Sequence, residues 1–407
     1  METTKEEFKV ALDSGNSEAS FIEGDLLVRQ PSIISKTRKN PFYEDLNLED
    51  AVKNIYDQLV VSIQSPALSG GLPATYYIGK FASESTSSYS NTVLGMTEKH
   101  TGKVPVVVAL GLVAARAVQR AHKKDPLLTQ DIEATVDMAT GLPVREFNSG
   151  TGDLFAERFT KGYHEVTVLL GKEKHVKVRI NFDFVKVFPE AAPVVFSIVY
   201  DKNKKPRKGD IFKDFQEKYG WNPFDGSHFL GKRLLHIDIG DGTTEYVITE
   251  GLNPNQKLTR GTNNGIGHAT ENILDDYSKI AHIKNPLRQD VTEVIKNQNH
   301  KWYAETMELL QEEFEIQADE IAVNALKLLD VVRNEVDAVV VYGGGSIPLK
   351  EYLYPELDEQ CAERRMDLFY VPEEYAATLF VQGLNIIIVN GLFDKLKKVA
   401  EEASLTN

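Results

Sequence analysis

Two stretches of the chain place an aspartate, a glycine and small polar side chains in the same order. ALDSGNSEASFIEG contains Asp13, and HIDIGDGTTEYVITEG contains Asp238. Each runs from an apolar residue through Asp-x-Gly and small polar residues into a strand that ends in Glu-Gly, and the second loop is predicted to be two residues longer. One such turn predicts only a hairpin. Its appearance in both halves of the chain predicts a duplicated unit.

The composition of the two hairpin tips favours binding of an anion. Glycines and small side chains let backbone N–H groups approach an anion closely. The hydroxyls of Ser17, Thr243 and Thr244 can donate hydrogen bonds to phosphate oxygens. Asp13 and Asp238 would repel a phosphate, unless a hard cation such as Mg²⁺ with its waters lies between. The pair of hairpins therefore predicts a magnesium-polyphosphate site in a cleft between two domains.

Two further glycine-rich stretches follow the second hairpin. VVVYGGGSIPL, residues 339–349, runs from an apolar strand through three glycines into a predicted helix. A lone triple glycine is also explained by a flexible turn, but after two Asp-x-Gly hairpins it predicts bare backbone for a nucleotide to lie against. NNGIGH, residues 263–268, is explained equally well by a plain loop into a helix.

The predicted elements around these stretches alternate between strands and helices, which indicates an α/β architecture. Residues 46–64 read as a polar helix, and residues 105–122 read as a mostly apolar one. The turn-rich segment 201–232, which begins with the basic run KNKKPRK, predicts a linker or an insertion between two halves. We therefore expect a first domain over 1–199, a second over 200–372, and C-terminal helices over 373–407 that return to the first domain.

The bulk composition fits a folded protein and excludes some partners. The chain has 407 residues and a net charge of −14, so its surface as a whole is unsuited to direct binding of nucleic acid. The single cysteine, Cys361, fits a reducing cytoplasm. The start METTKEEFKV lacks the apolar core of a signal peptide. The apolar stretch 104–118 is interrupted by Arg116 and is shorter than the ~20 residues of a membrane span, so we expect a buried helix.

The two hairpins and the late triple glycine resemble the phosphate loops and the adenosine motif of the actin, chaperone and sugar-kinase superfamily. Within it, the chain is most similar to ParM-type actins, the filament-forming ATPases that segregate plasmids. The stretches that carry this resemblance are QPSIIS at 30–35, YYIGKFA at 76–82, TGLPV at 140–144, FVKVFPEAAPVVF at 184–196 and PEEYAATLFVQGLNII at 372–387. The resemblance implies a two-domain actin-like ATPase fold, with duplicated mixed sheets flanked by helices and a nucleotide cleft between the domains.

The resemblance also implies roles for particular residues, with ATP or ADP and Mg²⁺ as cofactors. Glu190 would orient the attacking water, although a glutamate after Pro189 could instead only complement the positive end of a helix. Asp238 would support hydrolysis, and Asp13 and Asp238 would hold Mg²⁺, mainly through waters. The residues implied to surround the phosphates are Asp13, Gly15, Asn16, Ser17, Gly240, Asp241, Gly242, Thr243 and Thr244. Those implied to lie beside the adenosine are Gly265, Gly267, Gly343, Gly344, Gly345 and Ser346.

The implied function is a cytoplasmic ATPase that forms dynamic filaments of its own copies and segregates plasmid or phage DNA. It would reach DNA through an adaptor protein of ParR type, with no direct contact to nucleic acid or to a membrane. One alternative on the same superfold is a sugar or small-acid kinase, which would consume ATP only with its substrate. Another is an ATP-driven binder, either a chaperone or a cell-shape scaffold.

Overall fold

The computed structural model describes residues 3–68, 72–85, 90 and 98–405, and the chain divides into two compact units. Unit 1 comprises residues 1–189 and 384–407, and unit 2 comprises residues 190–383. The division follows Pro189 rather than residue 199, so the helix after the PE dipeptide belongs to unit 2. The chain returns to unit 1 from residue 384, inside helix α13 (Leu379–Val389).

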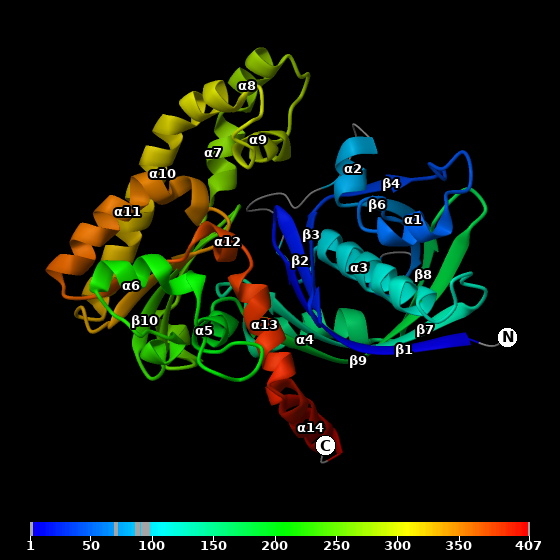
Figure 1. Ribbon diagram of the computed structural model, residues 1–407, viewed down its shortest axis with the longest axis horizontal. Coiled ribbons are helices and arrows are strands. Elements are labelled where there is room, and N and C mark those ends of the chain that lie inside the picture. Colours follow the sequence, from blue (N-terminus) through cyan, green and yellow to red (C-terminus); the bar gives the residue numbers. More distant parts are fainter. Residues whose placement is uncertain (1–2, 69–71, 86–89, 91–97, 406–407) are drawn as a thin grey trace. The chain divides into compact units, whose positions relative to one another are not determined.

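Unit 1 is built on a nine-stranded mixed sheet of strand order β3-β2-β1-β7-β9-β8-β5-β6-β4 (Figure 1). Its strands are β1 (Thr3–Ser14), β2 (Glu18–Glu23), β3 (Leu26–Pro31), β4 (Ile34–Thr37), β5 (Val60–Gln64), β6 (Ala74–Ile78), β7 (Asp131–Leu142), β8 (Tyr163–Leu169) and β9 (His175–Pro189). Its helices are α1 (Leu48–Lys53), α2 (Lys80–Ser85), α3 (Lys103–His122), α4 (Ser149–Thr160) and α14 (Leu392–Leu405).

Unit 2 is built on a six-stranded sheet in which β12-β11-β10-β14-β15 are neighbours and β13 pairs with β11. Its strands are β10 (Arg233–Ile239), β11 (Thr244–Glu250), β12 (Asn253–Pro254), β13 (Arg260–Thr262), β14 (Ala338–Tyr342) and β15 (Asp367–Tyr370). Its helices are α5 (Ala192–Val199), α6 (Lys213–Tyr219), α7 (Ile266–Asn272), α8 (Leu274–Ala281), α9 (Arg288–Ile295), α10 (Tyr303–Val331), α11 (Ser346–Glu363) and α12 (Glu373–Ala376), with 3-10 turns η1 (Asp210–Phe212), η2 (Gly226–Phe229) and η3 (Gln256–Leu258).

The duplication predicted from the sequence is present in the sheet topology. In each unit the hairpin's first strand pairs antiparallel with the next strand and parallel with a later one, β1 with β2 and β7, and β10 with β11 and β14. Asp13 faces Ser20, and Asp238 faces Glu245. Each aspartate is thus paired across the hairpin with the residue seven positions later in the sequence. The second loop is therefore not two residues longer than the first; the extra residues lie farther along the second strand.

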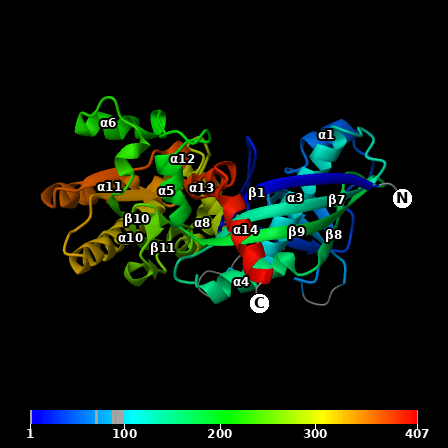
Figure 2. The ribbon, with the colours of Figure 1, turned by 90° about the horizontal axis from the view of Figure 1, so that it is seen from below.

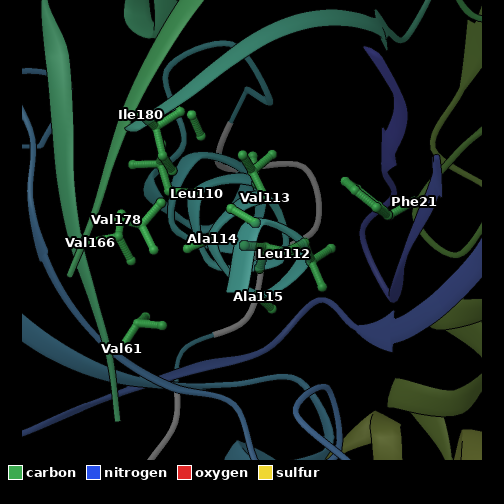
Figure 3. Close-up of a cluster of buried hydrophobic side chains, with 14 of the residues drawn as sticks. Phe21, Val61, Leu110, Leu112, Val113, Ala114, Ala115, Val166, Val178 and Ile180 are labelled. Atoms are coloured by element: carbon green, nitrogen blue, oxygen red, sulfur yellow. The ribbon is translucent and has the colours of Figure 1, made fainter. Parts of the chain in front are cut away.

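Helix α3 forms the centre of the unit 1 core. Its length and composition would suffice to cross a membrane, but 83% of its most apolar window is buried inside the unit. Figure 3 shows Leu110 and Ala114 on the side of this helix that faces Val178 and Ile180 of β9. Side chains of β9 alternate between buried and exposed from His175 to Asp183, as expected for a strand with one face on a core. The expected buried helix is confirmed.

One expectation from the sequence is wrong, and one of the two alternatives left open for segment 201–232 is excluded. The predicted helix over 46–64 is only the short helix α1 followed by strand β5, whose VVSI run favours a strand because Val and Ile are β-branched. Segment 201–232 is a folded part of unit 2 rather than a linker. Its aromatic side chains pack with Phe369 of β15 in one cluster, whose other members are Phe212, Phe215, Trp221, Phe224 and Phe229.

Helix α14 covers the face of the unit 1 sheet that lies opposite α3 (Figure 2). Phe393 is fully buried, and its ring lies 5.2 Å from the ring of Phe184 on β9. Lys397 pairs with Asp137 of β7 at 2.8 Å and also with Asp183. Asp183 is the residue skipped in the β7–β9 register, so a bulge supplies the second carboxylate.

This docking predicts unequal effects of two truncations within one helix. Phe393→Ala should destabilise unit 1 by about 3–5 kcal/mol, because it removes a fully buried ring. Val399→Ala, whose side chain is 64% exposed, should change stability by less than about 0.5 kcal/mol. Urea denaturation followed by circular dichroism measures both, and equal midpoints for the two variants would contradict the docking.

Candidate functional site

The second hairpin presents its aspartate on one face of the unit 2 sheet. Asp238, near the end of β10, lies beside Glu245 of β11 and Tyr342 of β14 in the strand register, so the three side chains share a face. The opposite face carries Ile237, Ile239 and other apolar residues into the core of the unit. Asp238 is partly exposed, whereas Glu245 and Tyr342 are buried. The sheet therefore places an accessible carboxylate beside buried polar groups.

Glu190 joins this face from the segment that opens unit 2. Burial raises the pKa of the Tyr342 hydroxyl well above its usual range, and the negative charges of Asp238, Glu190 and Glu245 raise it further. The phenol therefore stays protonated at neutral pH, and within the described part of the chain its oxygen has no hydrogen-bond partner. Glu190 and Asp238, the two residues expected to be catalytic, both belong to unit 2, and both raise the pKa of this phenol. Glu245 and Tyr342 lie within the stretches quoted above but were not predicted as site residues, because only the strand register shows that their side chains share a face with Asp238.

The backbone after Glu190 is held in a conformation that most residues avoid. Ala191 is fully buried and has φ 85° and ψ −39° as the residue preceding helix α5. Such a positive φ is costly for a residue with a Cβ and persists only where the surroundings enforce it. Glu190 itself lies in the turn between β9 and α5, with Pro193 in the first turn of the helix.

The carbonyls of the second hairpin loop are all engaged from inside unit 2. The Ile239 carbonyl accepts a hydrogen bond from the Gly345 N–H at 2.8 Å. The Gly240 and Asp241 carbonyls accept from the N–H groups of Ile266 at 3.2 Å and Gly267 at 2.7 Å, respectively. The Gly242 carbonyl oxygen lies 3.1 Å from His268 Nε2. Because a peptide unit points its N–H away from its C=O, the N–H groups of residues 241–243 are directed away from these partners, whereas the N–H of Gly240 donates to the Thr243 carbonyl at 2.9 Å within the loop. That is the orientation that anion binding needs.

Glycines make this close approach possible. A Cβ on Gly265 would lie 2.4 Å from the Asp241 carbonyl oxygen, and one on Gly343 would lie 2.4 Å from that of Ile239. A Cβ on Gly345 would meet the Ile239 side chain at 2.7 Å. The glycines expected beside an adenosine thus contact the hairpin's own backbone. Gly344 is exposed, and a Cβ added to it would lie 4.0 Å from its nearest neighbour, the Cβ of Ala377. Its bare backbone is therefore open to a ligand.

Several predicted site residues turn their side chains inward. Asp241 pairs with buried Arg288 at 3.3 Å; burial raises the pKa of Asp241, and the guanidinium opposes that rise. The Thr244 hydroxyl donates to the Asn264 carbonyl at 3.0 Å, and the Ser346 hydroxyl donates to the Gly343 carbonyl at 2.8 Å. These three side chains hold the loops together. The backbone of the loops, rather than these side chains, is then available to a ligand.

An open groove of about 510 Å³ lies beside the Asn263–Asn264 turn in unit 2. One wall is helix α10, which contributes Asp319, Glu320, Asn324 and Lys327. This wall carries hydrogen-bond donors and acceptors of both charges, which suits a neutral polar group such as a sugar or a base edge. The sequence did not indicate this wall, because its residues are spaced as on any exposed helix.

The first hairpin, in unit 1, is tied down through its carbonyls in a similar way. The Ser32 hydroxyl donates to the Gly15 carbonyl at 2.6 Å, and the Ser32 N–H donates to the Ser17 carbonyl at 2.8 Å. Asn16, at the tip, lines a cavity of about 200 Å³. Asp13 pairs with Lys99 at 3.3 Å, and Lys99 is buried. No motif pointed to Lys99, because it reaches the hairpin from a distant part of the sequence.

The donor chemistry is compatible with Mg²⁺. Among the described residues, no group of three or more His, Cys, Asp or Glu side chains is placed to cage a metal ion. Mg²⁺ does not require such a cage, because it keeps several waters and binds through one or two carboxylates together with substrate phosphates. Asp238 of unit 2 is a partly exposed carboxylate of this kind, and Asp13 of unit 1 is paired with Lys99.

Comparison with known proteins places the chain among actin-like folds. Residues 11–192 match the family described as actin like proteins N terminal domain, and residues 236–354 match the C-terminal part of the archaeal actin homologue MreB-like family. No curated protein matches the sequence. The chain therefore has the two-domain actin-like fold, with two mixed sheets and flanking helices, as expected from the sequence.

Three solved structures illustrate the likeness. The actin-like protein Alp7A has a TM-score of 0.70 at 15% identity, with 99% of this chain and 100% of that chain covered. Bacillus thuringiensis ParM with ATP gives 0.61 at 16%, covering 95% and 98%. A pCBH ParM non-polymerisable quadruple mutant gives 0.63 at 16%, covering 93% and 98%. At these identities the likeness concerns the fold.

The packing of the second loop predicts opposite outcomes for two glycine substitutions. Gly265→Ala should destabilise unit 2 by about 1–3 kcal/mol, because its Cβ has no room beside the Asp241 carbonyl. Gly344→Ala, which meets nothing closer than 4.0 Å, should leave stability nearly unchanged. Thermal denaturation of the nucleotide-free protein measures both, and an unchanged melting temperature for Gly265→Ala would show that the loop does not need this contact.

Buried His236 predicts a pH dependence of unit 2. Burial lowers its pKa to about 3, while its ring bonds the Thr249 hydroxyl at 3.0 Å. A histidine that stays neutral in the folded state is protonated only in the unfolded state below pH ~6.5, so its stabilisation is lost as pH falls from there toward 3. His236→Leu should remove up to about 1.4 kcal/mol per pH unit of that slope. Urea denaturation between pH 7 and 5 tests this, with exposed His175→Leu as the control that should keep the slope.

Proposed function

We propose that the chain is an ATPase that polymerises in its ATP-bound state and disassembles after hydrolysis. The observation that carries this proposal is the strand register that sets Asp238 beside Glu245 and Tyr342 on one face of the unit 2 sheet, next to a hairpin loop whose carbonyls are all engaged inside the unit. Glu190 also acts on this face, since its charge raises the pKa of Tyr342. The same hairpin topology recurs in unit 1. The similar Bacillus thuringiensis ParM has been solved with ATP, AMPPNP and ADP, which supports an adenine nucleotide as the ligand.

In this proposal each part of the chain has a defined task. Backbone N–H groups of the two hairpin loops bind phosphate oxygens, and Gly344 with the groove along α10 takes the nucleoside. Mg²⁺, held through waters by Asp13 and Asp238, supplies charge neutralisation of the phosphates. Glu190 accepts a hydrogen bond from the attacking water and orients it. Positioning and electrostatics of this kind are most of what phosphoryl transfer to water requires.

The cellular role that we propose is segregation of plasmid or phage DNA by cytoplasmic filaments. One similar structure is that of a non-polymerisable mutant of pCBH ParM, so the unmutated pCBH ParM polymerises. This supports filament assembly as the property that we propose for the present chain. The net charge of −14 disfavours direct contact with DNA, so an adaptor protein of ParR type would connect filament and DNA. ATP hydrolysis would weaken subunit contacts because a nucleotide that binds two conformations unequally shifts their populations.

Assembly tests the function directly. With Mg²⁺ and ATP, or a non-hydrolysable analogue, the purified protein should scatter light above a critical concentration and show filaments by electron microscopy. Mg-ATP should also raise the melting temperature, since a ligand bound only to the folded state stabilises it by mass action. Absence of any shift at millimolar ATP would refute nucleotide binding, whereas sugar-dependent ATP consumption by a monomer would favour a kinase.

Substitution of Glu190 separates chemistry from binding. Glu190→Gln should bind ATP and polymerise but hydrolyse ATP at least about 10²-fold more slowly, because the amide oxygen that replaces the carboxylate is an uncharged and far weaker base toward the water. Its filaments should then persist. Glu250→Gln, at the far end of β11, is the control that should keep the wild-type rate. A wild-type rate for Glu190→Gln would remove this residue from the site and leave it the role of complementing the positive end of helix α5.

A further inference from the structure

The tip of the first hairpin contains no basic side chain. Between Asp13 and Ser20 the charged side chains are Asp13 and Glu18, and there is no lysine or arginine. A polyphosphate carries several negative charges, and protein sites for it usually add a lysine or arginine to backbone N–H groups. If this hairpin takes phosphates, a cation must reach it from elsewhere in unit 1.

Lys99 is the cation that reaches it. Its Nζ lies 3.3 Å from Asp13 Oδ1, and its side chain is 6% exposed. Together with Ser14 and Asn16 of the hairpin it lines the cavity of about 200 Å³. Burying an ammonium group costs free energy unless a counter-charge lies beside it, and here Asp13 supplies that charge.

The backbone around Lys99 is fixed from two sides. The Glu146 carboxylate accepts the N–H groups of Lys99 at 3.1 Å and His100 at 2.7 Å, and it also bonds the His100 ring. Arg158 on α4 donates to the carbonyls of His100 at 2.8 Å and Gly102 at 2.6 Å. Each of these bonds involves a charged group, and such bonds are the stronger kind. They hold Lys99 in place before any ligand arrives.

The rest of the cavity wall is also suited to an anion. Helix α3 begins at this wall with Lys103 and Val104, and its N-cap is Gly102, which has no side chain to cap the helix. Burial and nearby Lys36 lower the pKa of Lys103, as expected where positive charges gather. Among the lining residues the acidic one is Glu98, which is 69% exposed, and Asp13 lies next to the lining residue Ser14 and is paired with Lys99. Helix start and lysines together favour negative charge there.

We propose that Lys99 is the phosphate-binding cation of the first hairpin, and that the cavity takes the terminal phosphate groups of a nucleoside polyphosphate. Lys99 donates to a phosphate oxygen, and Asp13 keeps the ammonium group in place and charged. This assignment rests on the proposed function. It adds a residue that contacts substrate and explains why the hairpin itself needs no basic side chain. The rival explanation is an ion pair that only stabilises unit 1.

The test compares nucleotides that differ only in the number of phosphates. ATP and AMP affinities are measured by calorimetry for the wild type, Lys99→Met and Lys124→Met. Lys124 pairs with buried Glu6 of the same strand, β1, at 2.6 Å and serves as a matched control. Lys99→Met should weaken ATP binding roughly 10-fold to 100-fold, the size of one charge-assisted hydrogen bond, and leave AMP affinity unchanged. Lys124→Met should leave both affinities unchanged.

Other outcomes would overturn the assignment. If Lys99→Met has a lower melting temperature but the wild-type ratio of ATP to AMP affinity, the ion pair is only structural. If inorganic phosphate binding depends on Lys99 while ATP binding does not, the cavity is a separate anion site. Lys99→Gln, which keeps a donor for Asp13, should show the same selective loss and replaces Lys99→Met should that variant not fold. A wild-type protein that binds no ATP would instead refute the proposed function.

Discussion

The site depends on one constraint, which is how closely other backbone segments approach the end of β10. Carbonyls of residues 239–242 all point into unit 2, where the loops at 265–268 and 343–345 meet them. Any side chain at Gly265, Gly343 or Gly345 would collide with this stretch. The hairpin loop is therefore held from behind by three glycines, and the N–H groups of residues 241–243 point away from that contact.

The two units share a topology but control their key aspartates differently. In unit 1, Asp13 is neutralised by Lys99, so that hairpin is locally balanced in charge. In unit 2, Asp238 shares its face with Glu245, and these carboxylates together with Glu190 raise the pKa of the Tyr342 phenol. In our proposal both aspartates hold waters of Mg²⁺, the first hairpin adds a lysine for the phosphates, and the second adds the acidic face on which the water is oriented. Duplication supplied the frame, and later differences in neighbouring residues account for the division of labour that we propose.

Short-range patterns predicted the fold, and long-range contacts escaped prediction. The Asp-x-Gly hairpins and the triple glycine are local signals, and the observed sheets contain them where expected. Lys99 and Arg288 could not be predicted, because each meets its aspartate across a long stretch of chain. For the same reason the inward direction of the Asp241 carboxylate was invisible. Segment 201–232 looked like a linker because turn residues separate its aromatic side chains, which meet only after folding.

The return of the chain to unit 1 has a consequence for synthesis on the ribosome. Unit 2 is continuous, so it can fold as soon as its residues have left the exit tunnel. Unit 1 also needs residues 384–407, and until these are made Phe184 and the pair Asp137 and Asp183 lack α14. The domain begun first is thus completed last, and its sheet carries an uncovered face for most of translation. Nascent chains arrested before α14 should therefore be the species that chaperones engage.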